Sequence, residues 1–138
     1  MKLKRISVFL FTLAAIILEA LPFSAVLNFA NPYGEPHRAL FSYFDPINIG
    51  YANFGPFLTA ALTTALAVLT LICCFIGRRG IIVAVTVLSA SAVATSLMPL
   101  MFGPRYMTAT GFAITGCLVG AFIFSLFFLK SSRISYNK

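Results

Sequence analysis

Glu19 is the only acidic residue inside an apolar stretch of this 138-residue chain, and its carboxyl group is the strongest candidate for chemistry. If that stretch crosses a lipid bilayer, a charged carboxylate near the centre costs about 2.5–3.5 kcal/mol on insertion scales. Glu19 should therefore face other protein groups, and be protonated or paired. The cations within reach on the expected side are Arg105 and Arg38, and Ser and Thr hydroxyls of neighbouring stretches are other partners. Glu19 is thus either a structural carboxylate fixed by Arg105 or a proton or cation site in a small transporter.

The remaining polar residues predict no enzyme and no metal site. His37 is the only histidine, and nothing in the spacing of Glu35, His37 and Asp45 requires them to meet. The chain has no nucleophile–base pair, no glycine-rich phosphate loop after a strand and no pair of carboxylates on one helix. We therefore expect no catalytic residue, no metal and no cofactor.

The three cysteines, Cys73, Cys74 and Cys117, all lie within apolar stretches. An odd number in that position does not suggest a disulfide framework. We expect them to be small packing residues, with lipidation of Cys73 or Cys74 near the membrane surface as the alternative.

Four apolar stretches must position these residues, and each is about 20 residues long, enough for a helix to cross a hydrocarbon layer of about 30 Å. The chain is 60% hydrophobic and 9% charged, whereas soluble domains carry about 25% charged residues. The sequence therefore predicts an all-α membrane protein, a four-helix transmembrane bundle that forms one domain over residues 1–138. The expected spans are 6–27, 57–76, 81–101 and 107–129.

The basic residues predict the orientation of these spans. Eight of the ten lie on the side of both termini and the turn at 77–80, and the other side has only Arg38 and Arg105. Lysine and arginine accumulate in cytoplasmic loops, so we expect a multi-pass protein of the cytoplasmic (plasma) membrane with both termini in the cytoplasm. The formal net charge of +7 does not indicate nucleic-acid binding, because no basic face with stacking aromatic residues exists.

An alternative for the N-terminus is a secretory signal peptide, since basic residues precede an apolar run. Cleavage would leave three spans. The possible cleavage sites around Ala20 and Ala25 each place a large residue where a small one is needed, so we expect the first span to be retained.

The expected outer connection at 28–56 is rich in aromatic residues, unlike a disordered linker. Turn signals at 31–34 and 45–46 suggest a short β-hairpin made of 38–44 and 47–51, or else a short amphipathic helix. We expect this connection to fold over the second outer loop at 102–106 and its flanks as an aromatic cap. Its candidate interaction surface consists of Tyr43, Phe44, Tyr51 and Phe54.

Gly116 and Gly120 are four residues apart in the last stretch, and Gly111 precedes them. Small residues allow helix backbones to approach closely within a membrane. We expect these glycines to pack helices within the bundle, with a contact between two copies of the chain as the alternative.

Two segments of the chain and the order of its loops resemble known proteins. AAIILEALP at 14–22 is similar to the first helix of small multidrug resistance transporters, which have four spans and one membrane glutamate but shorter loops. The order of a long outer loop, a short inner turn and a short outer loop resembles that of claudin-type proteins, without their tryptophan motif and cysteine pair. The run at 43–60 resembles segments of small four-span bacterial membrane proteins of unknown function, which implies a shared architecture.

The leading functional interpretation is a non-enzymatic membrane protein that acts through contacts with lipid, with another membrane protein or with itself. The alternative is a small transporter or channel subunit that uses Glu19. A polar cavity reaching Glu19 would favour transport, and a filled bundle would disfavour it.

Overall fold

The computed structural model describes residues 2–35, 37–46 and 53–136. Within them are four α-helices and one pair of antiparallel strands. In chain order the elements are α1 (Lys2–Glu19), β1 (Ala25–Phe29), β2 (His37–Phe41), α2 (Gly55–Phe75), α3 (Arg79–Ser96), the short 3₁₀ helices η2 (Met98–Phe102) and η3 (Pro104–Tyr106), and α4 (Ala109–Tyr136).

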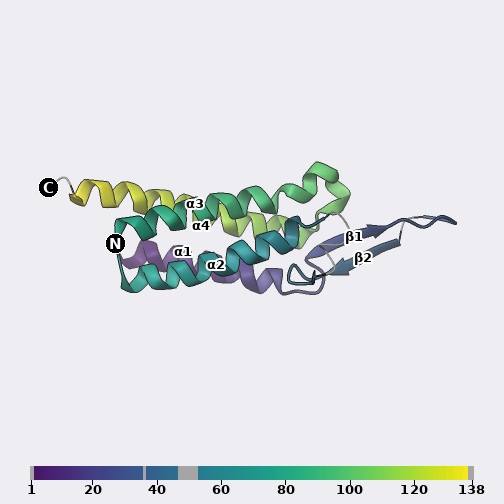
Figure 1. The fold of residues 1–138 in the computed structure, drawn as a ribbon, viewed down its shortest axis with the longest axis horizontal. Coiled ribbons are helices and arrows are strands. Elements are labelled where there is room, and N and C mark those ends of the chain that lie inside the picture. The colour runs from purple at the N-terminus through teal and green to yellow at the C-terminus, as the bar shows by residue number, and fades with distance from the viewer. Residues whose placement is uncertain (1, 36, 47–52, 137–138) are drawn as a thin grey trace.

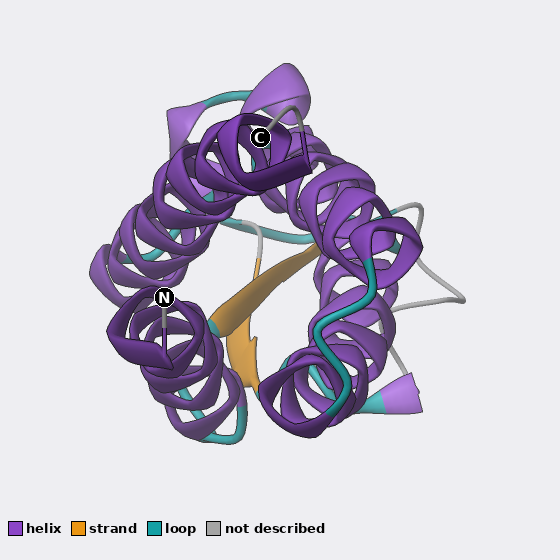
Figure 2. Cartoon of the chain, turned by 90° about the vertical axis from the view of Figure 1, so that its left-hand side faces the viewer, coloured by secondary structure: helices purple, strands orange, loops and turns teal. Residues whose placement is uncertain are grey.

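The four helices lie side by side, and each packs against two others (Figure 2). α1 contacts α2 and α4, and α3 contacts the same two helices from the other side. The start of α1, the turn between α2 and α3 and the last part of α4 lie at one end, which we call the basic end (Figure 1). The strands extend from the opposite end, which we call the hairpin end.

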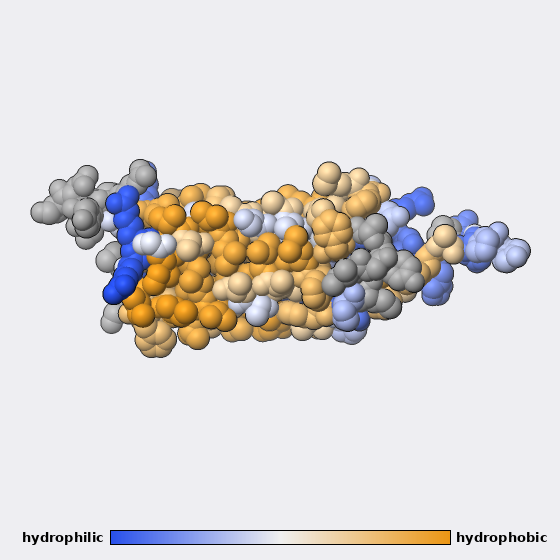
Figure 3. Space-filling model, in the orientation of Figure 1, coloured by the Kyte–Doolittle hydropathy of each residue, from blue (hydrophilic) through white to orange (hydrophobic). Residues whose placement is uncertain are grey.

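Three of the helical segments are long and apolar enough to cross a membrane. Within the described residues they are α2, the segment Arg79–Phe102 and the segment Ala109–Ser132, which confirms a helix of sufficient length at three of the four expected spans, to within a few residues. α1 does not qualify, because its 18 residues include Lys2, Lys4, Arg5 and Glu19. Hydrophobic side chains cover the visible middle of the molecule, and hydrophilic ones gather at the two ends (Figure 3).

The first helix ends earlier than the apolar pattern predicts. The expected span ran to residue 27, but α1 ends at Glu19 and residues 25–27 belong to β1. Pro22 has no backbone N–H to donate and disfavours helical conformation in the residue before it. The main-chain carbonyl of Glu19, which has no partner within the helix, instead accepts hydrogen bonds from the Ser24 and Ser42 hydroxyls, both at 3.1 Å, and from the Tyr43 N–H at 3.0 Å. These donors satisfy the end of the helix.

The hairpin also differs from the expected one. β1 pairs with β2 in an antiparallel register from Ala25↔Phe41 to Phe29↔His37. The connection passes through the first turn signal, where the Tyr33 N–H donates to Asn31 Oδ1 at 3.1 Å. The predicted strand at 38–44 overlaps β2, but its observed partner is β1, whose residues 25–27 belong to the expected first span. The predicted partner, 47–51, lies outside the described residues.

Several contacts fix the hairpin to the helices. Ala25 forms a bridge with Met107, the Thr108 hydroxyl donates to the Ser24 carbonyl at 2.7 Å, and the buried Asn53 amide donates to the Val26 carbonyl at 3.1 Å. β1 also packs against η3. β1 thus joins the hairpin to the second outer loop, partly through Ala25, a residue that precedes the predicted connection at 28–56.

Candidate functional site

Glu19, the last residue of α1, lies inside the protein with 0% of its surface exposed. The Thr63 hydroxyl oxygen of α2 lies 2.8 Å from Glu19 Oε1 and also 2.8 Å from the Thr59 carbonyl oxygen. A hydroxyl has only one proton, so it cannot donate to both oxygens at once. A protonated Glu19 removes this competition, because its O–H donates to Thr63 Oγ1 while Thr63 donates to Thr59. The hydrogen bonds at this site are thus best satisfied by a neutral carboxyl group.

The two arginines expected near Glu19 lie elsewhere. Arg38 is in β2 and Arg105 is in η3, and both are exposed. They line one cavity of about 670 Å³ together with Asn28, Ala30, Glu35 and Tyr106. The structure therefore brings Arg38 and Arg105 together in one cavity. Glu19 is instead bonded to the Thr63 hydroxyl, and a hydroxyl was the other kind of partner that the sequence suggested.

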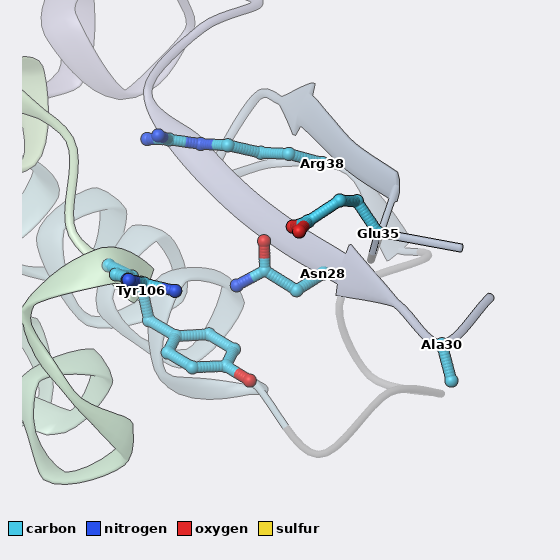
Figure 4. A pocket seen from close by; sticks show the side chains of 6 residues that line it. Asn28, Ala30, Glu35, Arg38 and Tyr106 are labelled. Carbon is cyan, nitrogen blue, oxygen red and sulfur yellow. The ribbon is translucent and has the colours of Figure 1, made fainter.

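The hairpin supplies most of this cavity, which we call the arginine cavity. Asn28 and Arg38 are opposite each other in the strand register, so their side chains share one face of the hairpin. Figure 4 shows Asn28, Glu35 and Arg38 along the hairpin and Tyr106 facing them from the other side. Sequence reasoning missed Asn28, Glu35 and Tyr106 as members of a site, because only the strand register and the fold of η3 bring them together.

Tyr43 is a core residue, which corrects its assignment to the interaction surface. Only 2% of its surface is exposed. Its hydroxyl lies beside Gly111 of α4, where an added Cβ would be 3.2 Å from the oxygen. Burial raises the pKa of the Tyr43 hydroxyl above its ordinary value, and a negative charge on Glu19 would raise it further. Tyr43 is therefore a neutral packing residue that joins the chain after β2 to α1 and α4.

The other members of the expected interaction surface differ in their placement. Phe44 and Phe54 are 40% and 42% exposed at the hairpin end, and Tyr51 lies outside the described residues. Tyr33, at the hairpin turn, is 97% exposed and was not among the predicted residues. Among the described residues, the exposed aromatic side chains of this end therefore include Tyr33, Phe44 and Phe54, together with Phe23 and Phe102.

The three glycines of α4 have separate environments. Gly111 accommodates Tyr43, and an added Cβ at Gly120 would lie 2.9 Å from the Phe11 ring of α1. Gly116 is exposed, and a Cβ there would meet nothing within 4 Å. Packing within the chain accounts for Gly111 and Gly120, whereas Gly116 faces outward.

Arg5 forms a second polar site, at the basic end, that sequence reasoning did not single out. Its Nη1 donates to the Cys73 carbonyl at 3.2 Å, and its guanidinium lies 5.0 Å from the centre of the Phe128 ring. Gly77 leaves room for the guanidinium, since a Cβ there would overlap it. Arg5 thus joins α1 to α4 and to the carboxyl end of α2, where a positive charge is favourable.

The interior hydroxyl groups connect neighbouring helices. Thr59 pairs with Thr95 at 3.0 Å, Thr115 with Ser96 at 3.1 Å, and Ser89 with Ser125 at 3.4 Å. All six of these hydroxyls also lie within hydrogen-bond distance of a carbonyl three or four residues earlier in their own helix. Because each hydroxyl has one proton, it donates either to the carbonyl of its own helix or to the hydroxyl of the neighbouring helix, and in both cases its proton has an acceptor.

The described residues contain no group of three side chains able to hold a metal ion. His37 is exposed on β2, Cys73 is buried, and Cys74 and Cys117 are partly buried free cysteines. Neither the lipidation alternative nor the expectation that the chain is not an enzyme is tested by these placements. Comparison of the whole chain with protein-family models, with curated proteins and with solved structures gives no match.

Proposed function

We propose that this chain is a four-span, non-enzymatic protein of the cytoplasmic membrane that acts through contacts made by its hairpin end. The observation that carries the proposal is the division of its surface into an apolar middle and a polar extension at one end (Figure 3). Large apolar side chains are exposed on every helix, for example Ile17 at 59%, Val68 at 56%, Val87 at 61% and Phe127 at 57%. Exposed apolar surface on this scale is stable in lipid.

α1 is proposed as the fourth span. It lies along α2 and α4, and its outward face carries Ile6, Leu10, Leu13 and Ile17, all at least 40% exposed. Its charged residues lie at its two ends, where Lys2, Lys4 and Arg5 reach the basic end and Glu19 is buried. Such a distribution removes the cost of placing charge against lipid.

The polar hairpin supports a function through contacts, because it extends beyond the helices and exposes aromatic side chains (Figure 1). Transport through Glu19 has less support. Its carboxyl group is fully buried and bonded to Thr63, so an exchanging ion would have to break that packing first.

Cysteine labelling in intact cells tests the proposed topology. In a background with Cys73, Cys74 and Cys117 replaced by alanine, single cysteines replace Lys2, Tyr33 or Gly80. A membrane-impermeant maleimide should label Tyr33→Cys in intact cells, and should label Lys2→Cys and Gly80→Cys only after permeabilisation. Labelling of both Lys2→Cys and Tyr33→Cys from outside would exclude α1 as a span, and labelling of Lys2→Cys and Gly80→Cys without Tyr33→Cys would reverse the orientation.

Photo-crosslinking tests the contact function. A photoreactive amino acid at Tyr33 should give discrete protein or lipid adducts in native membranes. The matched control is Val87, an exposed residue on α3, which should give only diffuse lipid adducts. Equal adduct patterns from the two positions would contradict a special role for the hairpin end.

A further inference from the structure

We propose that the arginine cavity binds a phosphoethanolamine headgroup, with the phosphate held by Arg38 and Arg105 and the ammonium held by Glu35. This inference rests on the proposed function, because it names the chemistry that the hairpin end recognises. A cavity of about 670 Å³ lies within the range of about 300–1,000 Å³ usual for small-molecule sites.

The two guanidinium groups supply the phosphate subsite. They come from β2 and η3, which are far apart in the chain, and they line the same cavity. Neither arginine forms an ion pair with another residue that the structure describes, so their donors are available. Guanidinium groups bind phosphate oxygens through paired, charge-assisted hydrogen bonds.

Asn28 and Tyr106 add neutral groups to the same cavity. The Asn28 carboxamide extends from the hairpin toward the side occupied by Tyr106 (Figure 4). An amide N–H and a phenol O–H can each donate to a phosphate or glycerol oxygen. The cavity thus presents polar donors from both of its walls.

Glu35 determines which phosphate compound fits. A carboxylate would weaken a site for a simple anion, yet Glu35 lines this cavity with its side chain directed along the hairpin face that carries Arg38 (Figure 4). A cavity with both signs of charge suits a zwitterion. A primary ammonium donates hydrogen bonds to a carboxylate, whereas a choline group has no N–H to donate. The geometry therefore favours ethanolamine over choline.

The position in the chain places the cavity at the level of lipid headgroups. Arg105 and Tyr106 are within four residues of Ala109, where the apolar segment of α4 begins. Tyrosine is enriched at that boundary. The headgroup could be supplied by phosphatidylethanolamine in the bilayer or by a free phosphoethanolamine compound, since both carry the same two charges.

Binding to the purified full-length protein in detergent tests the proposal. The probes are dihexanoyl phosphatidylethanolamine, the matching phosphatidylcholine and phosphatidylglycerol, and soluble glycerophosphoethanolamine. We expect phosphatidylethanolamine to bind at least about tenfold more tightly than phosphatidylcholine. Binding of glycerophosphoethanolamine as well would show that the headgroup suffices, and binding of the lipid alone would assign the bilayer as the source. Equal affinity for phosphatidylethanolamine and phosphatidylcholine would overturn the proposal.

Three variants assign the roles. Arg38→Gln and Arg105→Gln should each weaken phosphatidylethanolamine binding about tenfold or more. Glu35→Gln should abolish the preference over phosphatidylcholine while leaving phosphatidylglycerol binding equal or stronger. The matched control Arg79→Gln, at the basic end, should bind as the original protein does. All four positions are exposed, so circular dichroism should be unchanged, and retained binding in both arginine variants would refute the site.

Failure of this site and failure of the proposed function give different results. Binding in detergent does not depend on membrane orientation, whereas the labelling experiment measures orientation alone. Loss of headgroup selectivity with the expected labelling pattern would overturn only the cavity assignment.

Discussion

The Glu19 side chain is held by one short hydrogen bond, to Thr63, deep between α1 and α2. Thr63→Val keeps the size of the side chain but leaves the carboxyl group without this partner, so the free energy of unfolding should fall by about 1–3 kcal/mol. Glu19→Gln keeps an oxygen and a donor at the same position and should change it by less than about 1 kcal/mol. Thermal unfolding in detergent measures both. If Thr63→Val left the free energy of unfolding unchanged, this hydrogen bond would not stabilise the bundle.

Gly116 and Gly120 form a matched pair on α4. Gly120→Ala places a methyl group against the Phe11 ring and should destabilise the protein by about 1–3 kcal/mol. Gly116→Ala meets open space and should be neutral or stabilising by up to about 1 kcal/mol, as alanine favours helix. Thermal unfolding and size-exclusion chromatography in detergent measure the outcome. If Gly116→Ala instead separated an oligomer into smaller species, Gly116 would belong to a contact between copies of the chain.

Polar side chains join α1 to its neighbours near both of its ends, and Arg5 is its attachment at the basic end. Arg5→Lys keeps the charge but loses the planar guanidinium that bonds Cys73 and lies over Phe128. We expect a loss of about 1–2 kcal/mol, measured by thermal unfolding. Arg79→Lys, at the exposed start of α3, is the control and should have no effect. Equal stability of the two variants would contradict the role of Arg5.

Sequence reasoning located α2, α3 and α4 because an uninterrupted apolar run of span length has few other interpretations. It failed between α1 and β1, since Ala25–Phe29 continues the apolar run of the first helix and only Pro22 marks the boundary. Periodicity alone cannot separate a short buried strand from helix. Because β1 was not recognised as a strand, the pairing of Arg38 with Asn28 could not be predicted. The arginine cavity, which depends on that pairing, could not be predicted either.

Considered as a whole, the molecule has a strongly asymmetric distribution of positive charge, eight basic residues against Arg38 and Arg105. The double variant Arg78→Gln/Arg79→Gln lowers the number of basic residues on the side of the termini from eight to six, which still exceeds the two on the other side. We therefore expect its Tyr33→Cys and Lys2→Cys derivatives to keep the labelling pattern of the proposed orientation. Inverted labelling would mean that the turn between α2 and α3 sets the orientation by itself.

The hydroxyl groups that donate hydrogen bonds to carbonyls of their own helix have a consequence for biosynthesis. α2, α3 and α4 can each leave the translocation channel with their threonines and serines already bonded, so none of them has to wait for a neighbour before entering lipid. Glu19 has no such partner within α1. Its helix becomes fully compatible with lipid only after the segment that contains Thr63 has been synthesised, about forty residues later. The N-terminal helix should therefore settle in lipid only together with α2, although the ribosome makes it first.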